Sequence, residues 1–364
     1  MPIQQQPLFR LDALRPKLDA FRMTPALEAK QHVLAKWRDF IATEKIDKLK
    51  ETAILPSFIQ EVFRGVLGYS FAMDSPQRYT FSQEQHVAVD GKFADGAIGV
   101  FNGVPKFLAV LEGKGPLDPL DRPFAGRKRS AIEQGFNYAI NLKCDWVIIT
   151  NLKEIRLYHK GNDFGHFEQF NITQLAGSYP HFKRFLFLLG GERVVRADGS
   201  CHLPELLSDT ERIGQQVTVE YYGQFAGIRQ RAFDELCTAN PDTPKPEILK
   251  ATQKLLDRVL FCTFAENRGL LPSKTVTSAY LHKDPYHRRP IWDNFRGLFK
   301  SIDTGNPDLE IDEYNGGLFA HDELLDDRLK VADFIREKAF KSGTSVSKVR
   351  SHLRLPERAI CRVW

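Results

Sequence analysis

The sequence lacks the patterns that build zinc sites, nucleotide-binding loops and membrane spans. No C-x-x-C pair occurs among its five cysteines, which excludes the usual zinc spacings and indicates a reducing, cytoplasmic compartment. No G-x-x-x-x-G-K-[ST] motif is present, so nothing indicates an ATP site. The longest apolar runs are far shorter than a membrane span, and the N-terminal MPIQQQPLFR is not typical of a signal peptide. We therefore expect a cytoplasmic protein with no membrane contact.

The composition is otherwise that of a globular protein of two or three domains. The chain has 364 residues, of which 42% are hydrophobic and 27% charged, enough to bury a core in each domain. The net charge of +5 comes entirely from residues 331–364, where there are eight Lys and Arg and three Asp and Glu. The remaining residues balance at 43 against 43. Overall charge is therefore weak evidence for nucleic-acid binding, and only local clusters of basic residues count.

Four regions follow one another along the chain. Residues 1–50 are expected to be helical, with Thr24-Pro25 as the cap and first position of one helix. Residues 51–205 alternate between helix and strand patterns, and residues 206–330 are helical. Residues 331–364 form a basic, Ser-rich tail without a steady apolar period, which we expect to be poorly ordered. A truncated or frameshifted gene would produce such an end.

The second region carries the signals of a mixed sheet. An amphipathic helix over 54–67 is expected to end at Gly68. The capping box from Ser130 to Glu133 predicts a helix as far as Leu142. Strands are expected over 79–90, from 92 to a hairpin turn at 102–103, and over 107–111, 146–150 and 154–159. The run FLAVL at 107–111 is typical of a strand covered on both faces. The expected fold class is a small α/β or α+β domain.

The third region has helical patterns only. A second capping box, from Ser208 to Glu211, predicts the start of this domain. Helices are expected over 211–238, 246–267 and 290–301. The preceding residues 171–203 have a mixed pattern that favours neither helix nor strand.

Two acids and a lysine mark one end of the predicted sheet. Glu112 and Lys114 follow the apolar strand, and residues i and i+2 of a strand share a face. Asp95 lies on the preceding strand of the hairpin and can bring a second carboxylate to the same point. Two carboxylates and a lysine that converge are suited to holding a divalent cation and activating water. The pattern E-x-K alone is weak, since Glu28-Ala29-Lys30 repeats it on a helix, and an ion-paired strand end is the plainer alternative.

Other polar residues can join this site. Gln134 and Tyr138 are i and i+4 on the capped helix, so they lie on one face; an amide that satisfies nearby backbone is the alternative for Gln134. Glu61 lies off the apolar stripe of its helix, where a solvated carboxylate is the simpler interpretation and a third metal ligand the other. A basic loop follows the acids, and contact with phosphates competes there with a solvated surface. Its basic residues are Arg122, Arg127, Lys128 and Arg129.

Together these residues resemble the PD-(D/E)xK nuclease superfamily. Asp95, then Glu112-x-Lys114, then Gln134-x-x-x-Tyr138 is similar to the branch with a Q-x-x-x-Y helix, found in type I restriction subunits and at the N-terminus of type IIG restriction–modification enzymes. Four longer segments are also similar to type IIG sequences: FADGAIG, LAVLEGKGP, EQGFNYA and WVIITNLKEIRLY. The stretches 264–272 and 315–319 resemble motifs of the helical connector that precedes the methyltransferase in those enzymes. The likeness covers roughly residues 50–330.

The resemblance implies a restriction-endonuclease-like nuclease domain followed by an all-α connector. It implies Mg²⁺-dependent hydrolysis of double-stranded DNA, with Mn²⁺ as a substitute. Asp95, Glu112 and the Gly113 carbonyl would hold the metal, and Lys114, Gln134 and Tyr138 would complete the catalytic set. The four basic loop residues would contact the DNA backbone.

The sequence departs from this family in two ways. Ala94 stands where the family often has proline, a common variation. The chain also has no F-x-G-x-G loop and no N-P-P-[YF] tetrapeptide, so it carries no adenine-specific methyltransferase or S-adenosylmethionine site, and a methyltransferase or specificity polypeptide is the expected partner. The alternatives are a non-catalytic DNA-binding or docking fragment, and a repair-type nuclease of the same superfamily.

Overall fold

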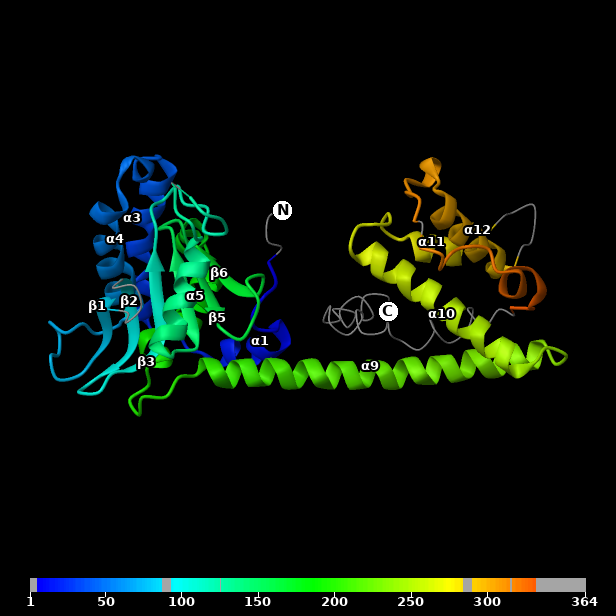
Figure 1. Ribbon diagram of the computed structural model, residues 1–364, viewed down its shortest axis with the longest axis horizontal. Helices are drawn as coiled ribbons and strands as arrows, with labels where there is room; N and C mark the ends of the chain where they lie inside the picture. Colours follow the sequence, from blue (N-terminus) through cyan, green and yellow to red (C-terminus); the bar gives the residue numbers. More distant parts are fainter. Residues whose placement is uncertain (1–4, 87–92, 125, 284–289, 315, 332–364) are drawn as a thin grey trace. The chain divides into compact units, whose positions relative to one another are not determined.

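The chain divides into two compact units, Met1–Ile213 and Gly214–Trp364. The computed structural model, drawn in Figure 1, describes residues 5–86, 93–124, 126–283, 290–314 and 316–331. The tail 332–364, the first residue of the motif at 315–319, and part of the strand expected over 79–90 lie outside the described residues. No helix in the described part of the chain is long and apolar enough to cross a membrane.

A six-stranded mixed sheet forms the centre of the first unit, with its strands in chain order from β1 to β6. Only β3 and β4 run parallel, and α5 (Ala131–Leu142) connects them; the other neighbours are antiparallel. The strands are β1 (Tyr79–His86), β2 (Phe93–Phe101), β3 (Lys106–Gly113), β4 (Trp146–Thr150), β5 (Glu154–His159) and β6 (Phe167–Asn171). This unit is therefore α+β, one of the two expected classes.

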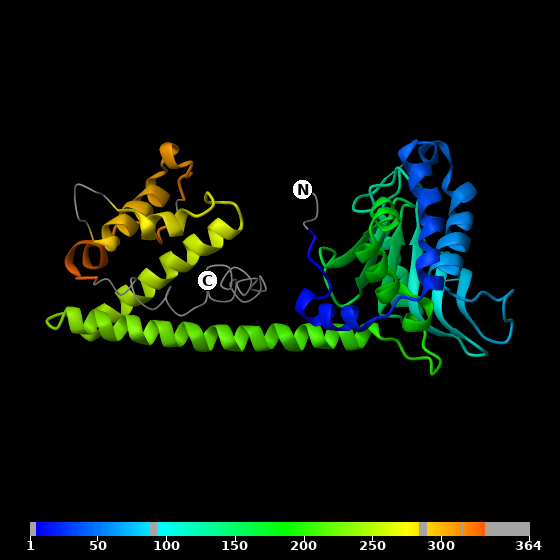
Figure 2. The same ribbon diagram turned by 180° about the vertical axis from the view of Figure 1, so that it is seen from behind.

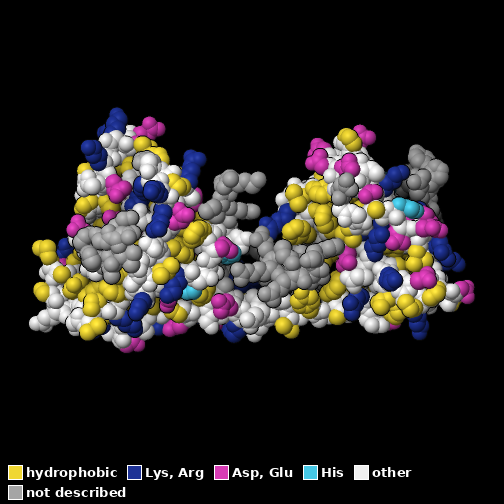
Figure 3. All heavy atoms as spheres, viewed as in Figure 1, with side chains coloured by type: hydrophobic (Ala, Val, Ile, Leu, Met, Phe, Trp, Pro, Cys, Tyr) yellow, Lys and Arg dark blue, Asp and Glu magenta, His cyan; other side chains and the backbone are white. Residues whose placement is uncertain are grey.

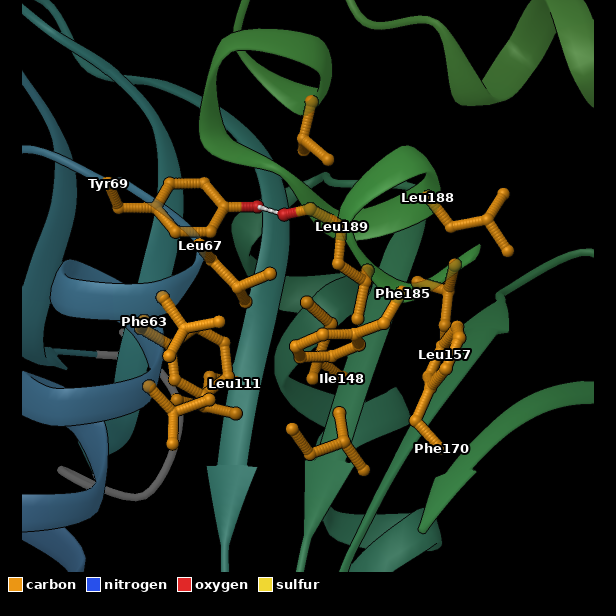
Figure 4. Packing of buried hydrophobic residues seen from close by; sticks show 14 of the residues in the cluster. Phe63, Leu67, Tyr69, Leu111, Ile148, Leu157, Phe170, Phe185, Leu188 and Leu189 are labelled. Carbon is orange, nitrogen blue, oxygen red and sulfur yellow. Dashed lines mark hydrogen bonds between the residues drawn. The ribbon is translucent and has the colours of Figure 1, made fainter. Parts of the chain in front are cut away.

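Both faces of the sheet are covered, which explains the unbroken apolar run in β3. Leu111 belongs to the larger core cluster and Val110 to the smaller one, because adjacent side chains of a strand point to opposite faces. Figure 4 shows Leu111 among the larger cluster, with the Tyr69 hydroxyl donating to the carbonyl oxygen of Leu189 at 2.8 Å. Helix α5 covers the smaller cluster, and Figure 2 shows the N-terminal helices on the other face.

The N-terminal helices belong to the same unit as the sheet. Leu34 and Trp37 are buried in the larger core cluster with strand residues such as Ile148, so residues 5–50 pack as part of the sheet unit rather than apart from it. The Thr24 side chain accepts a hydrogen bond from the Leu27 N–H at 3.3 Å, as the expected cap does. The helices are α1 (Leu11–Ala20), α2 (Pro25–Ala29), α3 (Gln31–Ala42) and the short η1 (Ile46–Lys48).

The helix expected over 54–67 begins earlier and changes type. Helix α4 covers Glu51–Phe58 and continues as a π-helix, η2 (Ile59–Val66), in which the Leu67 N–H bonds the Val62 carbonyl. Such wider turns are uncommon and are found frequently at functional sites. Gly68 ends the segment with φ +81°, as expected.

The mixed pattern at 171–203 contains more structure than the sequence indicated. Strand β6 closes the sheet beside β5, and its end, Asn171, caps α6 by accepting hydrogen bonds from the Thr173 and Gln174 N–H groups. Three helices follow: α6 (Ile172–Gly177), α7 (Tyr179–Leu189) and α8 (Gly191–Val194). Helix α7 carries five phenylalanine and leucine side chains that are buried at its C-terminal end.

Helix α9 (Leu203–Ala239) starts before the second capping box. The prediction of a helix start at Ser208 was therefore wrong. Leu203 and Leu206 are buried in the core of the first unit, so packing has already formed the helix before Ser208 is reached. A capping sequence can lie inside a helix when tertiary contacts favour continuation.

The second unit is helical, as expected. Its further helices are α10 (Lys245–Asn267), α11 (Thr275–Leu281), α12 (Ile291–Thr304), η3 (Pro307–Leu309) and the π-helix η4 (Glu323–Arg328); the sequence had not indicated α11. The fully buried Arg258 organises this unit. Its guanidinium donates to the carbonyls of Leu318 and Ala320 at 2.9 and 2.8 Å and pairs with Asp326 at 2.8 Å.

Candidate functional site

The candidate site lies at the edge of the sheet where β2 begins and β3 ends. Gly96 of β2 is opposite Leu111 of β3 in an antiparallel register, which brings the start of one strand beside the end of the other. The neighbouring β4 ends at the same edge because it runs parallel to β3. The Lys114 N–H donates to the Thr150 carbonyl at 2.8 Å, so the chain leaving β3 stays fixed to this edge.

The structure brings Asp95, Glu112 and Lys114 together. The Gly113 backbone N–H donates to Oδ2 of Asp95 at 2.7 Å. The Lys114 ammonium forms an ion pair with Oε1 of Glu112, and both side chains are buried, with 6% and 1% of their residue surfaces exposed. Glu112 and Lys114, which are residues i and i+2, therefore lie on one face of the sheet at this strand end, as expected. The cluster of Asp95, Glu112 and Lys114 therefore contains residues from the start of β2 and from the end of β3.

Glu112 is the most constrained group of the cluster. Burial raises the pKa of its carboxyl to about 8, and the nearby Asp95 charge adds to the rise, whereas Lys114 opposes it. Oε2 of Glu112 is buried and has no hydrogen-bond partner among the described residues. A buried carboxylate oxygen without a partner is costly. A cation placed beside Oε2 would remove that cost.

The same cluster also shifts the pKa values of Lys114 and Asp95. Burial acts to lower the pKa of Lys114, but the charge of Glu112 and the hydrogen bond to it raise the pKa above its usual value. The pKa of Asp95 is raised, chiefly by burial, while the Gly113 hydrogen bond and Lys114 act in the opposite direction. Lys114 therefore carries a positive charge close to two acids. Burial disfavours the ionised form of both acids.

Gln134 and Tyr138 of α5 lie beside this cluster. Nε2 of Gln134 donates to the Tyr138 hydroxyl at 2.7 Å. Burial raises the pKa of Tyr138, and the charges of Glu112 and Asp95 raise it further, which shows that this hydroxyl is within electrostatic reach of the acids. Gly135 allows the close approach of the helix, because a Cβ there would overlap the side chains of Ile149 and Val147.

Glu61 does not join the acids. Its carboxylate accepts hydrogen bonds from Lys36 at 2.8 Å and from Nε1 of Trp37 at 3.0 Å, both on α3. The π-helical segment that carries Glu61 packs against α3, so the side chain is used to fasten two helices. The structure thus places the expected third ligand in a different set of contacts.

Glu51, at the start of α4, is the acid that lies near the site instead. Its Oε2 accepts a hydrogen bond from the Gly115 N–H at 3.0 Å, one residue beyond Lys114. Its charge raises the pKa of Asp95 and of Glu112. Sequence reasoning missed it because the helix was expected to begin at residue 54. The acid in the first helical turn, a position that negative side chains favour, was the available signal.

The basic loop between β3 and α5 divides into two kinds of residue. Arg122, Lys128 and Arg129 are exposed, as contact with a phosphate backbone requires. Arg127 instead pairs with the buried Asp118, so the structure gives it an internal partner rather than a surface position. Figure 3 shows several Lys and Arg side chains exposed on the upper part of this unit, interspersed with Asp and Glu.

The residues at the site suit a hard divalent cation. In the described part of the chain no group of three or more His, Cys, Asp or Glu side chains gathers as a metal site. The candidate centre is a smaller set, two carboxylates with the Gly113 carbonyl. It contains Oε2 of Glu112, for which the described part of the chain offers no hydrogen-bond partner. Oxygen ligands of this kind, completed by water, are those that Mg²⁺ takes in proteins. The donor set therefore fits the ion.

Comparisons with known proteins add a distant likeness. No family model and no curated protein matches the chain. Among solved structures, a chain of "cryoEM structure DrdV-DNA complex" is similar at 18% sequence identity and a TM-score of 0.28, over 75% of this chain and 26% of that chain. The protein thus spans about a quarter of the length of that neighbour. A likeness at this TM-score indicates neither the fold nor the activity of the chain.

Proposed function

We propose that this chain is a Mg²⁺-dependent DNA endonuclease module of a restriction–modification enzyme, of the type IIG-like branch of the PD-(D/E)xK superfamily. The observation that carries the proposal is the junction of Asp95, Glu112 and Lys114 at one strand end. One carboxylate oxygen of Glu112 is buried there without a partner among the described residues, and Lys114 is paired with the other oxygen. The motif resemblance supplies the reaction class.

The proposed reaction is hydrolysis of a phosphodiester bond of double-stranded DNA. Water adds to phosphorus, the bond to the 3′ oxygen breaks, and the products carry a 5′-phosphate and a 3′-hydroxyl. A cation held by Asp95, Glu112 and the Gly113 carbonyl would polarise the scissile phosphate and lower the pKa of a water molecule.

The side chains around the metal position have distinct roles in this proposal. Lys114 orients the attacking water and offsets the negative charge that builds on the phosphate oxygens. Gln134 holds the water or the metal shell, and Tyr138 fixes Gln134 through the 2.7 Å hydrogen bond. Glu51 adds a carboxylate beside Lys114 and Gly115, where it strengthens the attraction for a cation.

Sequence recognition is assigned to another polypeptide. Phosphate contacts position a nuclease on DNA but do not read bases. The basic residues of the loop would make contacts of that kind. We expect cleavage without sequence preference by this chain alone, and selective cleavage when a methyltransferase and recognition part is supplied. An intact set of Asp95, Glu112, Lys114 and Gln134 favours an active enzyme over a DNA-binding fragment, because a lost activity usually loses its acids first.

The test is nicking of supercoiled plasmid DNA by the whole chain, with Mg²⁺ or Mn²⁺ and with a chelator. Glu112→Ala and Lys114→Ala are compared with Lys143→Ala, an exposed lysine at the end of α5. The proposal expects metal-dependent nicking that both site variants lose and Lys143→Ala keeps. Nicking that survives both site variants would refute the assignment, and DNA binding without any nicking would favour the non-catalytic alternative.

A further inference from the structure

The loop between β3 and α5 is held by two arginines, one on the sheet and one within the loop itself. It connects Lys114 of the candidate centre to Ser130, which caps α5. Leu120, inside the loop, is fully buried in the smaller core cluster although its backbone has φ +63°. A bulky residue in this left-handed region is uncommon and is held there by its surroundings. The described part of the loop, residues 115–124 and 126–129, is therefore anchored at Leu120, and two arginines hold the residues around it.

The first fastening is Arg156 on β5. Its buried guanidinium reaches the loop and pairs with Oδ1 of Asp121 at 2.5 Å, while Glu154 accepts a second bond at 2.8 Å. It also lies over the Phe167 ring, 4.8 Å from the centroid. Burial acts to lower the pKa of Arg156, but the bonds to Glu154 and Asp121 raise it above its usual value.

Arg156 and Glu112 occupy one row of the sheet. Ile149 of β4 is opposite Glu112 on one side and opposite Arg156 on the other. Paired residues of neighbouring strands point to the same face, so Arg156 stands on the face that carries the candidate centre, about 10 Å away across two strand spacings. It is close enough to fix the loop beside the centre, and its two terminal NH₂ groups are engaged with Asp121, Glu154 and the Tyr158 hydroxyl.

The second fastening is Arg127, within the loop. It pairs with the buried Asp118, whose Oδ1 also accepts the Leu120 N–H at 2.9 Å and whose carbonyl accepts Nδ2 of Asn151 at 2.9 Å. Nε of Arg127 donates to the Phe124 carbonyl at 3.0 Å. One arginine thus joins the tip of the loop to its buried base.

We propose that Arg156 and Arg127 are positioning residues that hold this loop as a preformed DNA-contacting element, with Arg122, Lys128 and Arg129 as the side chains that it presents. The inference rests on the proposed function, and it assigns Arg127 a different role from the other basic residues of the loop. The kind of partner is the phosphate backbone of a duplex. Neither Arg127 nor Arg156 contacts the DNA or the reacting atoms.

A preformed loop binds more tightly than a mobile one because less ordering accompanies association. Each rotamer-rich side chain that becomes ordered at an interface opposes association, and the loop presents three such side chains. Releasing one fastening is therefore expected to weaken DNA binding by about tenfold, a loss of about 1.4 kcal/mol. At saturating DNA concentration, the rate of the chemical step should change little.

The test separates binding from chemistry. Asp121→Ala releases Arg156 from the loop and leaves Glu154 as its partner, and Arg127→Met releases Asp118. The control is Arg184→Met, which breaks another ion pair of the same unit, to the buried Glu168, away from the loop. The dissociation constant of a short labelled duplex is measured by fluorescence anisotropy with Ca²⁺. Single-turnover cleavage at saturating DNA is measured with Mg²⁺.

The proposal expects both loop variants to raise the dissociation constant about tenfold, with single-turnover rates within about twofold of wild type, and the control to bind as wild type does. Loop variants that bind as tightly as wild type would overturn it. So would a control that weakens binding equally, since the effect would then come from stability. Absence of cleavage by the wild type would count against the proposed function, while the binding comparison would still decide the loop's role.

Discussion

The backbone N–H of Gly113 donates a hydrogen bond to Oδ2 of Asp95 at 2.7 Å. This contact joins the start of β2 to the end of β3 and occupies one oxygen of the Asp95 carboxylate. The Gly113 carbonyl belongs to the next peptide group, which joins Gly113 to Lys114. A single glycine therefore fixes one candidate metal ligand through its N–H and offers another through its carbonyl oxygen.

Glu51 and Glu61 distinguish the structure from the expectation based on the sequence. Glu51→Gln is expected to lower metal-dependent nicking by roughly tenfold at limiting Mg²⁺, because it removes a negative charge beside Lys114 and Gly115 that attracts a cation. Glu61→Gln should leave nicking within about twofold and should lower the free energy of unfolding by about 1 kcal/mol, since Lys36 and Trp37 lose a charged acceptor. A Mg²⁺ titration of nicking, with chemical denaturation of both variants, checks this pair. The reverse pattern would restore Glu61 as the ligand.

Tyr138 is expected to act through Gln134. In Tyr138→Phe the Gln134 amide loses its acceptor at 2.7 Å, and a lost hydrogen bond of about 1 kcal/mol lowers the single-turnover cleavage rate by roughly fivefold. Tyr69→Phe is the control: Tyr69 is buried too, but its hydroxyl donates to Leu189 on the other side of the sheet. Equal losses in the two variants would show that general destabilisation, rather than the position of Gln134, explains the effect.

His202 should make the first unit less stable in acid. Burial lowers its pKa from 6.5 to about 4, helped by the charge of Arg193. Because the folded pKa lies below the unfolded value, the unfolded chain binds the proton first as pH falls. The stabilisation is complete above about pH 6.5 and is lost progressively down to about pH 4.

Between pH 7 and pH 5 this single group should remove on the order of 2 kcal/mol from the free energy of unfolding. His202→Asn keeps a donor for the Leu188 carbonyl, to which the ring bonds at 3.1 Å, but has no proton to gain. Urea denaturation of the wild type and the variant at the two pH values measures the difference. Parallel pH dependence in both proteins would exclude His202 as the cause.

Arg258 should control the stability of the helical unit. Arg258→Met leaves Asp326 without its cation and the carbonyls of Leu318 and Ala320 without donors. Removing one partner of a buried pair costs about 3–5 kcal/mol. Hydrogen exchange of amides in α10 and in residues 316–331 should therefore accelerate, with amides of the sheet unaffected. Arg296→Met, which removes half-exposed ion pairs to Asp293 and Asp327, should change little; comparable acceleration there would contradict the assignment.

The sequence was informative wherever a local pattern determines structure. The capping box at Ser130 starts α5, with the Glu133 carboxylate accepting the Ser130 N–H at 2.7 Å. Strand alternation placed Glu112 and Lys114 on one face, where they pair. These features depend on neighbours within four residues, which is the range over which sequence patterns report directly.

The features that the sequence did not indicate depend on contacts distant in the chain. Strand β6 exists because it pairs with β5, and α9 begins early because Leu203 packs into a core built from the sheet. Glu61 is turned to Trp37 by the packing of α3, and Asp121 is fixed by Arg156, 35 residues away. No local pattern encodes such pairings, so tertiary contacts decide them.

The central claim is that Asp95 and Glu112 hold a divalent cation beside Lys114. The most direct measurement is a crystal of the chain grown with Mn²⁺, with anomalous difference density collected at the manganese edge. We expect a peak between Asp95, Oε2 of Glu112 and the Gly113 carbonyl, about 2.0–2.3 Å from each oxygen, and no peak there in Glu112→Gln. A manganese peak elsewhere, or one that persists unchanged in Glu112→Gln, would contradict the account.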